Sequence, residues 1–172
     1  GGAVGVVKNL ALSCLISYYT SVKPVITLLE HLNVQKIDML SPCDCNNTTK
    51  IFINGDWKYI TTTIKKIYDV LLHQRRIGKL HIFTSIIWDI QENKLHIRTS
   101  SGRCVRPLYI LKDNRFMITN KHIILFDKNI INWDNLLLGN INKLYRDNLV
   151  NEAVIEYIDV GEEETCMLVS DS

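Results

Sequence analysis

The stretch that decides the fold is residues 51–78, which read IFINGDWKYITTTIKKIYDVLLHQRRIG. Asn54-Gly55 is the dipeptide most typical of a two-residue hairpin turn, and it lies between two short apolar runs. The threonines at 61–63 then offer N-cap hydroxyls, and Gly78 is suited to end a helix. Between them the apolar residues follow helical spacing on one face: Ile64, Ile67, Tyr68, Leu71 and Leu72. The stretch therefore predicts a β-hairpin followed by an amphipathic helix.

Residues 85–111 predict three strands. Residues 86–90 and 94–98 flank a short turn, and the second of these runs alternates apolar and polar residues. A turn ending at Gly102 leads into a third run, where Pro107 cannot donate a ladder hydrogen bond and indicates an edge or a bulge. These patterns predict an α+β fold of small mixed or antiparallel sheets with packed helices, in two adjoining subdomains.

The flanking regions predict further elements. Before the hairpin, an apolar stretch precedes a helix with Pro24 in its first turn, and the polar residues 41–49 are the best candidate boundary. After the strands, we expect a helix opened by Asn132 and running through Leu136, Leu137, Ile141 and Leu144. A strand over residues 154–158 should follow it.

Composition excludes several classes of protein. The 172 residues carry 20 Lys+Arg against 18 Asp+Glu, a net charge of +2, which is too small for a surface that tracks phosphates throughout. A hydrophobic content of 47% excludes a solvated acidic tail. The apolar runs fall well short of the roughly 20 residues that span a bilayer, so we expect no membrane contact. Because the sequence starts with Gly1 and not Met, we expect a piece of a longer protein.

Motifs that carry chemistry are scarce. The sequence has no phosphate-binding Gly-x-x-x-x-Gly-Lys-Ser/Thr, no Gly-x-Ser-x-Gly, no His-Glu-x-x-His and no Asp-x-Asp-x-Asp cluster for magnesium. Of five cysteines only Cys43 and Cys45 are close in sequence, which is a weak zinc signal and favours unpaired thiols. We therefore predict no catalytic residue, no metal ligand and no cofactor in this chain.

Three groups of residues allow two interpretations each. The acidic run 162–164 fits a cation or a basic partner, although a solvated turn is favoured. Lys65, Lys66, Arg75 and Arg76 suit phosphate contacts or an exposed helix face equally well. For Trp57, Trp88 and Trp133, apolar neighbours favour core packing over base stacking.

Five collinear stretches resemble the second-largest (β-like) subunit of multisubunit DNA-dependent RNA polymerases. Residues 5–10 (GVVKNL) are similar to the family's G-L-V-K-N-L, with Gly1 matching the end of E-T-P-E-G, and residues 24–29 (PVITLL) are similar to P-I-I-T-F-L. Residues 52–57 (FINGDW) resemble F-V-N-G-V-W, and residues 85–90 with 101–108 resemble S-M-I-R-D-I and D-A-G-R-V-Y-R-P-L. Residues 149–159 with the acidic run 162–164 resemble L-L-N-E-G-L-V-E-Y-I-D-A-E-E-E-E.

This resemblance implies a layout and a function. Residues 1–40 would end the fork region, 50–112 would form the external 1 domain and 113–172 the external 2 domain. The chain would be a structural part of a nucleotidyltransferase that acts in DNA-templated transcription, inactive alone, with the catalytic magnesium held elsewhere. The implied partners are the other polymerase subunits, chiefly the largest, with DNA template and RNA. Lys8 and Asn9 would lie near nucleic acid.

The same resemblance implies structural roles for eight residues: Gly55, Trp57, Gly102, Arg103, Arg106, Pro107, Glu152 and Tyr157. Because Arg103 and Arg106 are three apart in a strand, they should point to opposite faces. We expect Arg106 to be the one that pairs inside the fold, with Asp89 or with the Glu152 and Glu156 group.

Departures from the family pattern bear on the source. Gly2 replaces the glutamine of cellular enzymes, residues 133–149 include extra sequence, and the composition is A+T-rich in character. These features favour a large cytoplasmic DNA virus, with the protein in the viral factory or virion; a nuclear cellular enzyme is the alternative. A stand-alone interaction module that binds a transcription or host factor is the alternative function. The reading frame around this segment distinguishes the two functions.

Overall fold

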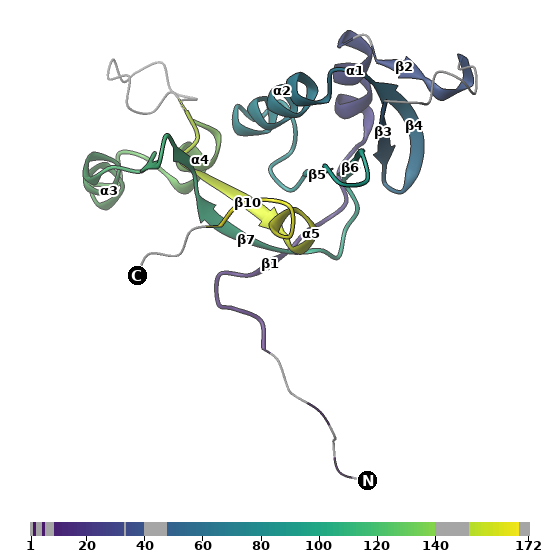
Figure 1. The fold of residues 1–172 in the computed structure, drawn as a ribbon. Helices are drawn as coiled ribbons and strands as arrows, with labels where there is room; N and C mark the ends of the chain where they lie inside the picture. Colours follow the sequence, from purple (N-terminus) through teal and green to yellow (C-terminus); the bar gives the residue numbers. More distant parts are fainter. Residues whose placement is uncertain are drawn as a thin grey trace.

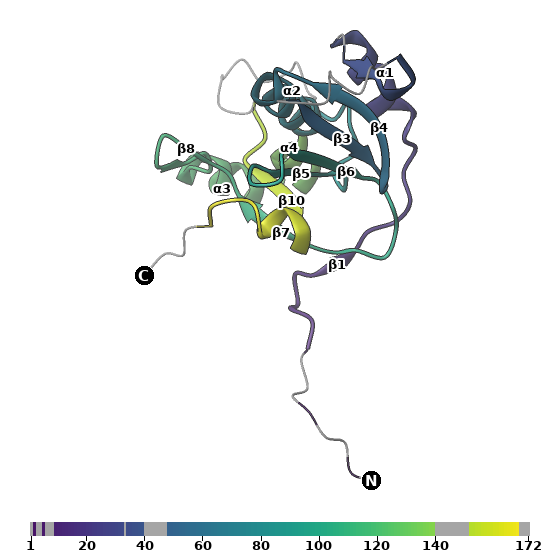
Figure 2. The same cartoon turned by 45° about the vertical axis from the view of Figure 1, so that its right-hand side comes forward.

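The computed structural model describes residues 2, 5, 9–32, 34–39, 48–139 and 152–168. Helices and small sheets are interleaved along this chain (Figures 1 and 2), which confirms the α+β prediction. The described strands form one five-stranded sheet, one three-stranded sheet and a two-stranded ribbon. Among the described residues no helix is long and apolar enough to cross a membrane.

The five-stranded sheet is mixed. Its spatial order is β2 (Gln35–Lys36), β4 (Asp56–Thr61), β3 (Thr49–Ile53), β6 (Lys94–Arg98) and β5 (Ser85–Asp89). All neighbours are antiparallel except β3 and β6, which run parallel. The turn between β3 and β4 has φ values of 51° at Asn54 and 93° at Gly55, as a tight hairpin requires. The predicted hairpin is therefore confirmed, with an added irregularity between Ile51 and Phe52.

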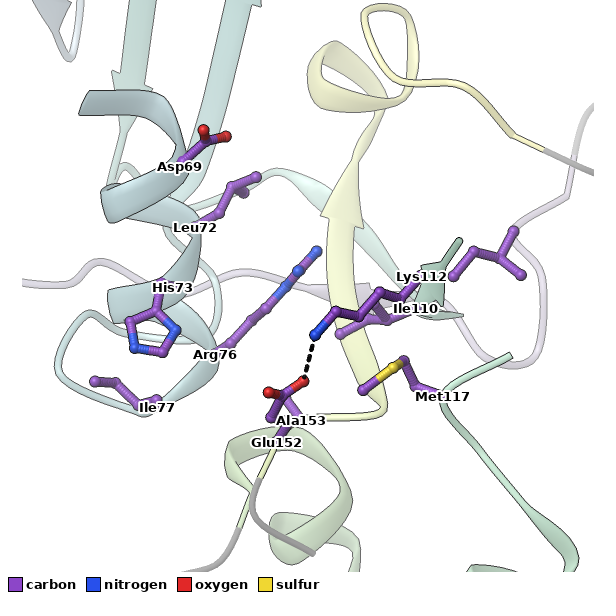
Figure 3. Close-up of a pocket in the computed structure, with 11 residues that line it drawn as sticks. Asp69, Leu72, His73, Arg76, Ile77, Ile110, Lys112, Met117, Glu152 and Ala153 are labelled. Atoms are coloured by element: carbon purple, nitrogen blue, oxygen red, sulfur yellow. Dashed lines mark ion pairs between the residues drawn. The ribbon is translucent and has the colours of Figure 1, made fainter. Parts of the chain in front are cut away.

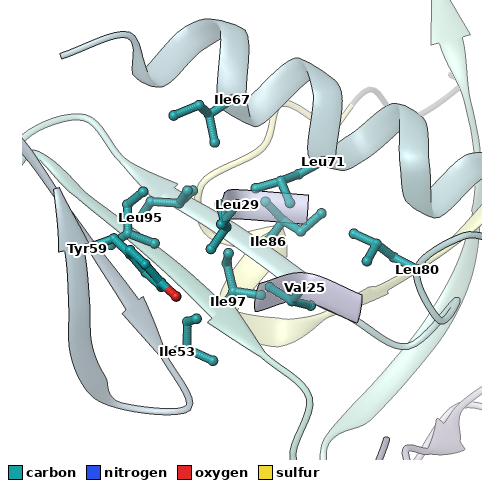
Figure 4. Packing of buried hydrophobic residues seen from close by; sticks show 11 residues of the cluster. Val25, Leu29, Ile53, Tyr59, Ile67, Leu71, Leu80, Ile86, Leu95 and Ile97 are labelled. Atoms are coloured by element: carbon teal, nitrogen blue, oxygen red, sulfur yellow. The ribbon is translucent and has the colours of Figure 1, made fainter. Parts of the chain in front are cut away.

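Two helices, α1 (Lys23–His31) and α2 (Ile64–Arg76), pack on the same face of this sheet (Figure 4). Pro24 lies in the first turn of α1, and Gly78 follows α2 with a φ of 76°, both as predicted. The threonine N-cap is different from the prediction, because no side chain caps α2. The buried core between helices and sheet consists of Val25, Leu29, Ile51, Ile53, Tyr59, Ile67, Leu71, Leu80, Ile86, Leu95 and Ile97.

The three-stranded sheet joins distant parts of the chain. Its central strand is β7 (Cys104–Tyr109), flanked by β1 (Leu15–Ile16) and β10 (Ile155–Asp159), both antiparallel to it. The chain thus passes from β6 of the five-stranded sheet to β7 of the three-stranded sheet. Gly102, with a φ of 81°, lies at this change of direction. β1 pairs only with Cys104 and Val105, so at Pro107 the side of β7 opposite β10 is an open edge in the described structure. This agrees with the edge that Pro107 predicted.

The remaining elements surround a second buried cluster that includes Val105, Leu136, Leu137, Ile155 and Tyr157. They are β8 (Leu111–Lys112), β9 (Arg115–Phe116), α3 (Asn120–Asp127), α4 (Trp133–Leu138) and α5 (Val160–Glu163). The exception is η1 (Ile37–Met39), which lies beside β4 of the five-stranded sheet. Asn132 opens α4 as predicted, and its backbone N–H donates to Asn135 Oδ1. The predicted continuation through Ile141 and Leu144 lies outside the described residues.

Candidate functional site: an ion network between helix α2 and strand β10

The site is centred on Arg75, whose side chain is only 2% exposed near the end of α2. Its guanidinium makes a two-pronged contact with Glu162 of α5: Nη1 lies 2.9 Å from Oε2, and Nη2 lies 2.8 Å from Oε1. Nη1 also donates to the carbonyl of Thr84 at 2.9 Å. Planar, two-pronged pairing of this kind fixes direction as well as distance.

Glu156 of β10 extends the network along α2. Its Oε2 accepts from Arg75 Nη2 at 3.1 Å and from Arg76 Nε at 3.1 Å, while its Oε1 accepts from Arg76 Nη2 at 3.0 Å. Two neighbouring arginines of one helix turn therefore hold a single strand carboxylate.

Asp159 forms a second centre at the end of β10. Its Oδ1 accepts from Ser85 Oγ at 2.9 Å and from the backbone N–H of Glu162 at 2.8 Å, which caps α5. Its Oδ2 accepts from Arg103 Nη1 at 2.8 Å. The strand end, the helix α5 and the edge strand β5 are thus joined through one carboxylate.

The electrostatics follow from burial and charge together. Burial would raise the pKa of Glu156, but Arg75 and Arg76 outweigh it and lower that pKa. Burial likewise opposes ionisation of Asp159, yet the hydrogen bonds from Arg103, the Glu162 N–H and Ser85 lower its pKa. At Glu162 burial dominates and raises the pKa, with Arg75 opposing the shift. Arg75 itself is held charged because its two carboxylates raise its pKa against the effect of burial.

The burial of the two arginines, Arg103 and Arg106, is the reverse of our prediction. Arg103 is the interior one: besides Asp159 it donates to the carbonyls of Phe83 and Ser100. Arg106 is 44% exposed and pairs with Glu163, so it is not the buried arginine that we predicted. Neither arginine pairs with Asp89, Glu152 or Glu156 among the described contacts.

Two interpretations of charged residues from the sequence are also wrong. Glu162 is 3% exposed, so the acidic run is not simply a solvated turn, and its basic partner lies within the chain. Arg75 does not belong to an exposed helix face. Arg75 is four positions after Leu71 and so lies on the apolar face of the helix. That spacing was the one signal in the sequence that could have indicated the burial of Arg75.

The tryptophans divide among three environments. Trp88 packs against the core beside Tyr68, as predicted. Trp57 instead stacks on Phe52 with ring centroids 6.3 Å apart and has Lys50 Nζ 4.8 Å from its ring centre. Trp133 is 40% exposed, against the core prediction, and its Nε1 donates to the Tyr157 hydroxyl at 3.2 Å.

The other predicted site residues lie apart from the network. Tyr157 is buried, and its ring packs edge-on to Phe83. Glu152 is exposed and pairs with Lys112 at 3.5 Å. Asn9 is exposed near the N-terminal end, and Lys8 lies outside the described residues.

A cavity of about 300 Å³ lies beside the network (Figure 3). Asp69, Leu72, His73 and Arg76 of α2 form one wall. The opposite lining comes from Ile110, Leu111, Lys112, Met117, Glu152 and Ala153. The Lys112–Glu152 ion pair lies in the lining opposite α2. Its lining mixes apolar groups with charges of both signs.

The donor set of the network does not suit a metal ion, because arginines already occupy its carboxylates. Within the described ranges no group of three or more His, Cys, Asp or Glu side chains is placed to hold a metal. Cys43 and Cys45 lie outside those ranges. The arrangement is therefore suited to fix elements relative to one another.

Comparison with known proteins gives this geometry a family context. Residues 51–112 match the family described as RNA polymerase Rpb2, domain 4, and residues 147–171 match RNA polymerase Rpb2, domain 5. Together these segments make up about half of the chain. Six of the eight ion pairs found among the described residues join one matched segment to the other.

The chain is also similar over nearly its whole length to curated proteins. It is 34% identical to DNA-directed RNA polymerase II subunit RPB2 of Encephalitozoon cuniculi, over 98% of the chain and 14% of that protein. It is 30% identical to DNA-directed RNA polymerase II subunit 2 of Arabidopsis thaliana, over 98% of the chain and 13% of that protein. It is 29% identical to DNA-directed RNA polymerase III subunit RPC2 of Drosophila melanogaster, over 95% of the chain and 13% of that protein. The chain thus spans about one seventh of the length of these relatives. It belongs to the Rpb2 family of second-largest RNA polymerase subunits, and its matched segments are those of the family's domains 4 and 5.

Proposed function

We propose that this chain is a non-catalytic structural block of an enzyme that synthesises RNA on a DNA template. The observation that carries the proposal is the ion network, because it joins the two Rpb2 domain segments through α2, β7, β10 and α5. Strand pairing adds to it, since β10 aligns with β7 over five residue pairs. Such a joint would make the two segments move as one body within the subunit.

The chemistry of the parent enzyme would lie outside this chain. The proposed reaction is nucleotidyl transfer with magnesium held elsewhere, in a complex with the largest subunit, DNA template and RNA. Within this chain the residues proposed nearest to nucleic acid are Lys8 and Asn9, in the stretch that resembles the fork segment.

The proposed source is a large cytoplasmic DNA virus, with the protein in the viral factory or the virion. The A+T-rich character of the composition and the departures from cellular sequences support it. Genomic context provides the test: a nuclear gene with introns would contradict this source.

The test of function uses the subunit that contains this segment, tagged and purified from its source. We expect a largest subunit to co-purify, together with magnesium-dependent RNA synthesis on added DNA. Arg75→Met should reduce recovery of the assembled enzyme, whereas the matched change Arg106→Met at the exposed pair should not. Recovery of the tagged protein with no polymerase subunit would refute the proposal and favour a stand-alone interaction module.

A further inference from the structure

The N-terminal arm, residues 9–22, is attached to the rest of the fold where residues 15–17 run along the start of β7. β1 pairs Leu15 with Val105 and Ile16 with Cys104, and the Ser17 N–H donates to the Arg103 carbonyl at 2.8 Å. Before β1 the chain projects away from the body (Figures 1 and 2), and Leu12 is fully exposed. Cys14 therefore lies where the arm leaves the sheet.

Two thiols meet at this point. Cys14 precedes Ile16 by two residues, so both side chains lie on the same face of the arm, and the β7 partner of Ile16 is Cys104. The Cys14 Sγ donates to the Leu15 carbonyl at 3.8 Å, and the nearby Cys104 thiol and Val105 backbone both act on the pKa of Cys14. Both cysteines are free and half-buried, which leaves each one accessible to a small reagent.

We propose that Cys14 and Cys104 are a redox-active pair whose disulfide fastens the N-terminal arm to β7. The oxidant is a small-molecule disulfide. One cysteine thiolate attacks a sulfur of that disulfide and expels the first small thiolate, forming a mixed disulfide on the protein. The other cysteine thiolate then attacks the protein-bound sulfur and expels the second. Two protein thiols lose two protons and two electrons, and one small disulfide becomes two thiols.

The backbone at Cys14 can meet the geometric demand of this bond. A disulfide needs Cα atoms about 4.4–6.8 Å apart, whereas diagonal neighbours in a regular antiparallel sheet are about 7 Å apart or slightly more. Cys14 is not held in the regular ladder. It precedes the first residue of β1 and closes a turn, in which its N–H donates to the Ala11 carbonyl at 2.9 Å. We therefore expect this turn, and not the β1 ladder, to take up the adjustment that the bond requires.

The reaction should be faster at higher pH. Burial, followed by the nearby Cys104 thiol, raises the pKa of Cys14, and the thiolate is the attacking form. Arg106, on the same face of β7, is a charged group beside the pair and opposes the shift of the Cys14 pKa.

The experiment uses the chain with Cys43, Cys45 and Cys166 all changed to Ser, so that only the proposed pair remains. After incubation with glutathione disulfide and digestion without reductant, we expect a peptide containing Cys14 linked to one containing Cys104 in the monomer. Hydrogen exchange at the amides of Leu15 and Ser17, the positions of β1 and its extension that bond to β7, should slow at least tenfold on oxidation and recover with dithiothreitol. The Cys14→Ser variant in the same background controls for glutathione bound at Cys104 alone.

Three outcomes would overturn the proposal. The first is stable glutathione adducts at both cysteines with no linked peptide. The second is linkage found only in dimers, which would make the pair intermolecular. The third is an intramolecular link that leaves exchange in the arm unchanged, which would show that the bond does not fasten it.

Discussion

Removal of Arg75 should expose how much the ion network contributes to stability. In Arg75→Met the Glu162 carboxylate loses both of its short contacts, and of its partners in the described part of the chain the Ile86 N–H at 3.4 Å remains. Breaking a buried pair from one side costs about 3–5 kcal/mol, because an uncompensated charge stays buried. The raised pKa of Glu162 moderates this cost, since the carboxyl can take up a proton. We therefore expect a loss near the lower end, about 3 kcal/mol.

The assay is urea unfolding of the chain, followed by tryptophan fluorescence, for Arg75→Met, Glu162→Leu and the double variant. A loss of about 3 kcal/mol corresponds to roughly 6–12 °C in melting temperature for a domain of this size. The double variant should recover most of it, because replacing both partners by apolar groups is close to neutral. Arg106→Met, at an exposed pair, should change stability by less than about 1 kcal/mol. A single-variant loss below 1 kcal/mol, or a double variant that loses the sum of both singles, would refute the reasoning.

Further predictions concern the strand arginines, acid and the hairpin. Arg103→Ala should lower the melting temperature clearly more than Arg106→Ala, because loss of the Arg103 side chain leaves the buried Asp159 carboxylate without its ion-pair partner. Equal shifts in a thermal scan would contradict this. The folded-state pKa values of Glu156 and Asp159 lie below 4.5 and 3.8, so their stabilisation is present above pH 4.5 and is lost as pH falls. Urea midpoints from pH 7 to 3 should show this decline, and Asp159→Asn should flatten it. Gly55→Ala, at a φ of 93°, should cost about 1–3 kcal/mol in urea unfolding, and a neutral result would show that the turn can change type.

The hairpin and α2 could be predicted because their signals are local. The Asn54-Gly55 turn and the spacing of Ile64 to Leu72 both act within a few residues, and the structure keeps them almost unchanged. Side-chain alternation also predicted that Arg103 and Arg106 point to opposite faces, and the two arginines do differ in partner and in exposure. Alternation does not indicate which face of the strand meets the rest of the chain. For that reason Arg106, and not Arg103, was predicted to be the buried arginine.

The ion network could not be predicted for a related reason. Arg75 and Glu162 are 87 positions apart in the sequence, and the Arg76–Glu156 contact spans 80. The pairing depends on β7 leaving the sheet of β5 and β6 to pair with β10, which the turn at Gly102 does not reveal by itself. The acidic run looked solvated because nothing nearby in the sequence could neutralise it.

The ionic character of this joint follows from what it has to cover. β5 is an edge strand of the five-stranded sheet, and unpaired edge groups readily pair with other chains. α5 lies against it so closely that a Cβ added at Gly161 would be 2.8 Å from Ile87 Cδ1, and Glu162 accepts from the Ile86 N–H. An apolar cover could bury the same edge but would leave the Ile86 N–H unsatisfied and would permit sliding. Two-pronged arginine pairs accept only one alignment of α2 with α5, so stability and alignment are separable properties of this joint, and the charges are needed chiefly for the second.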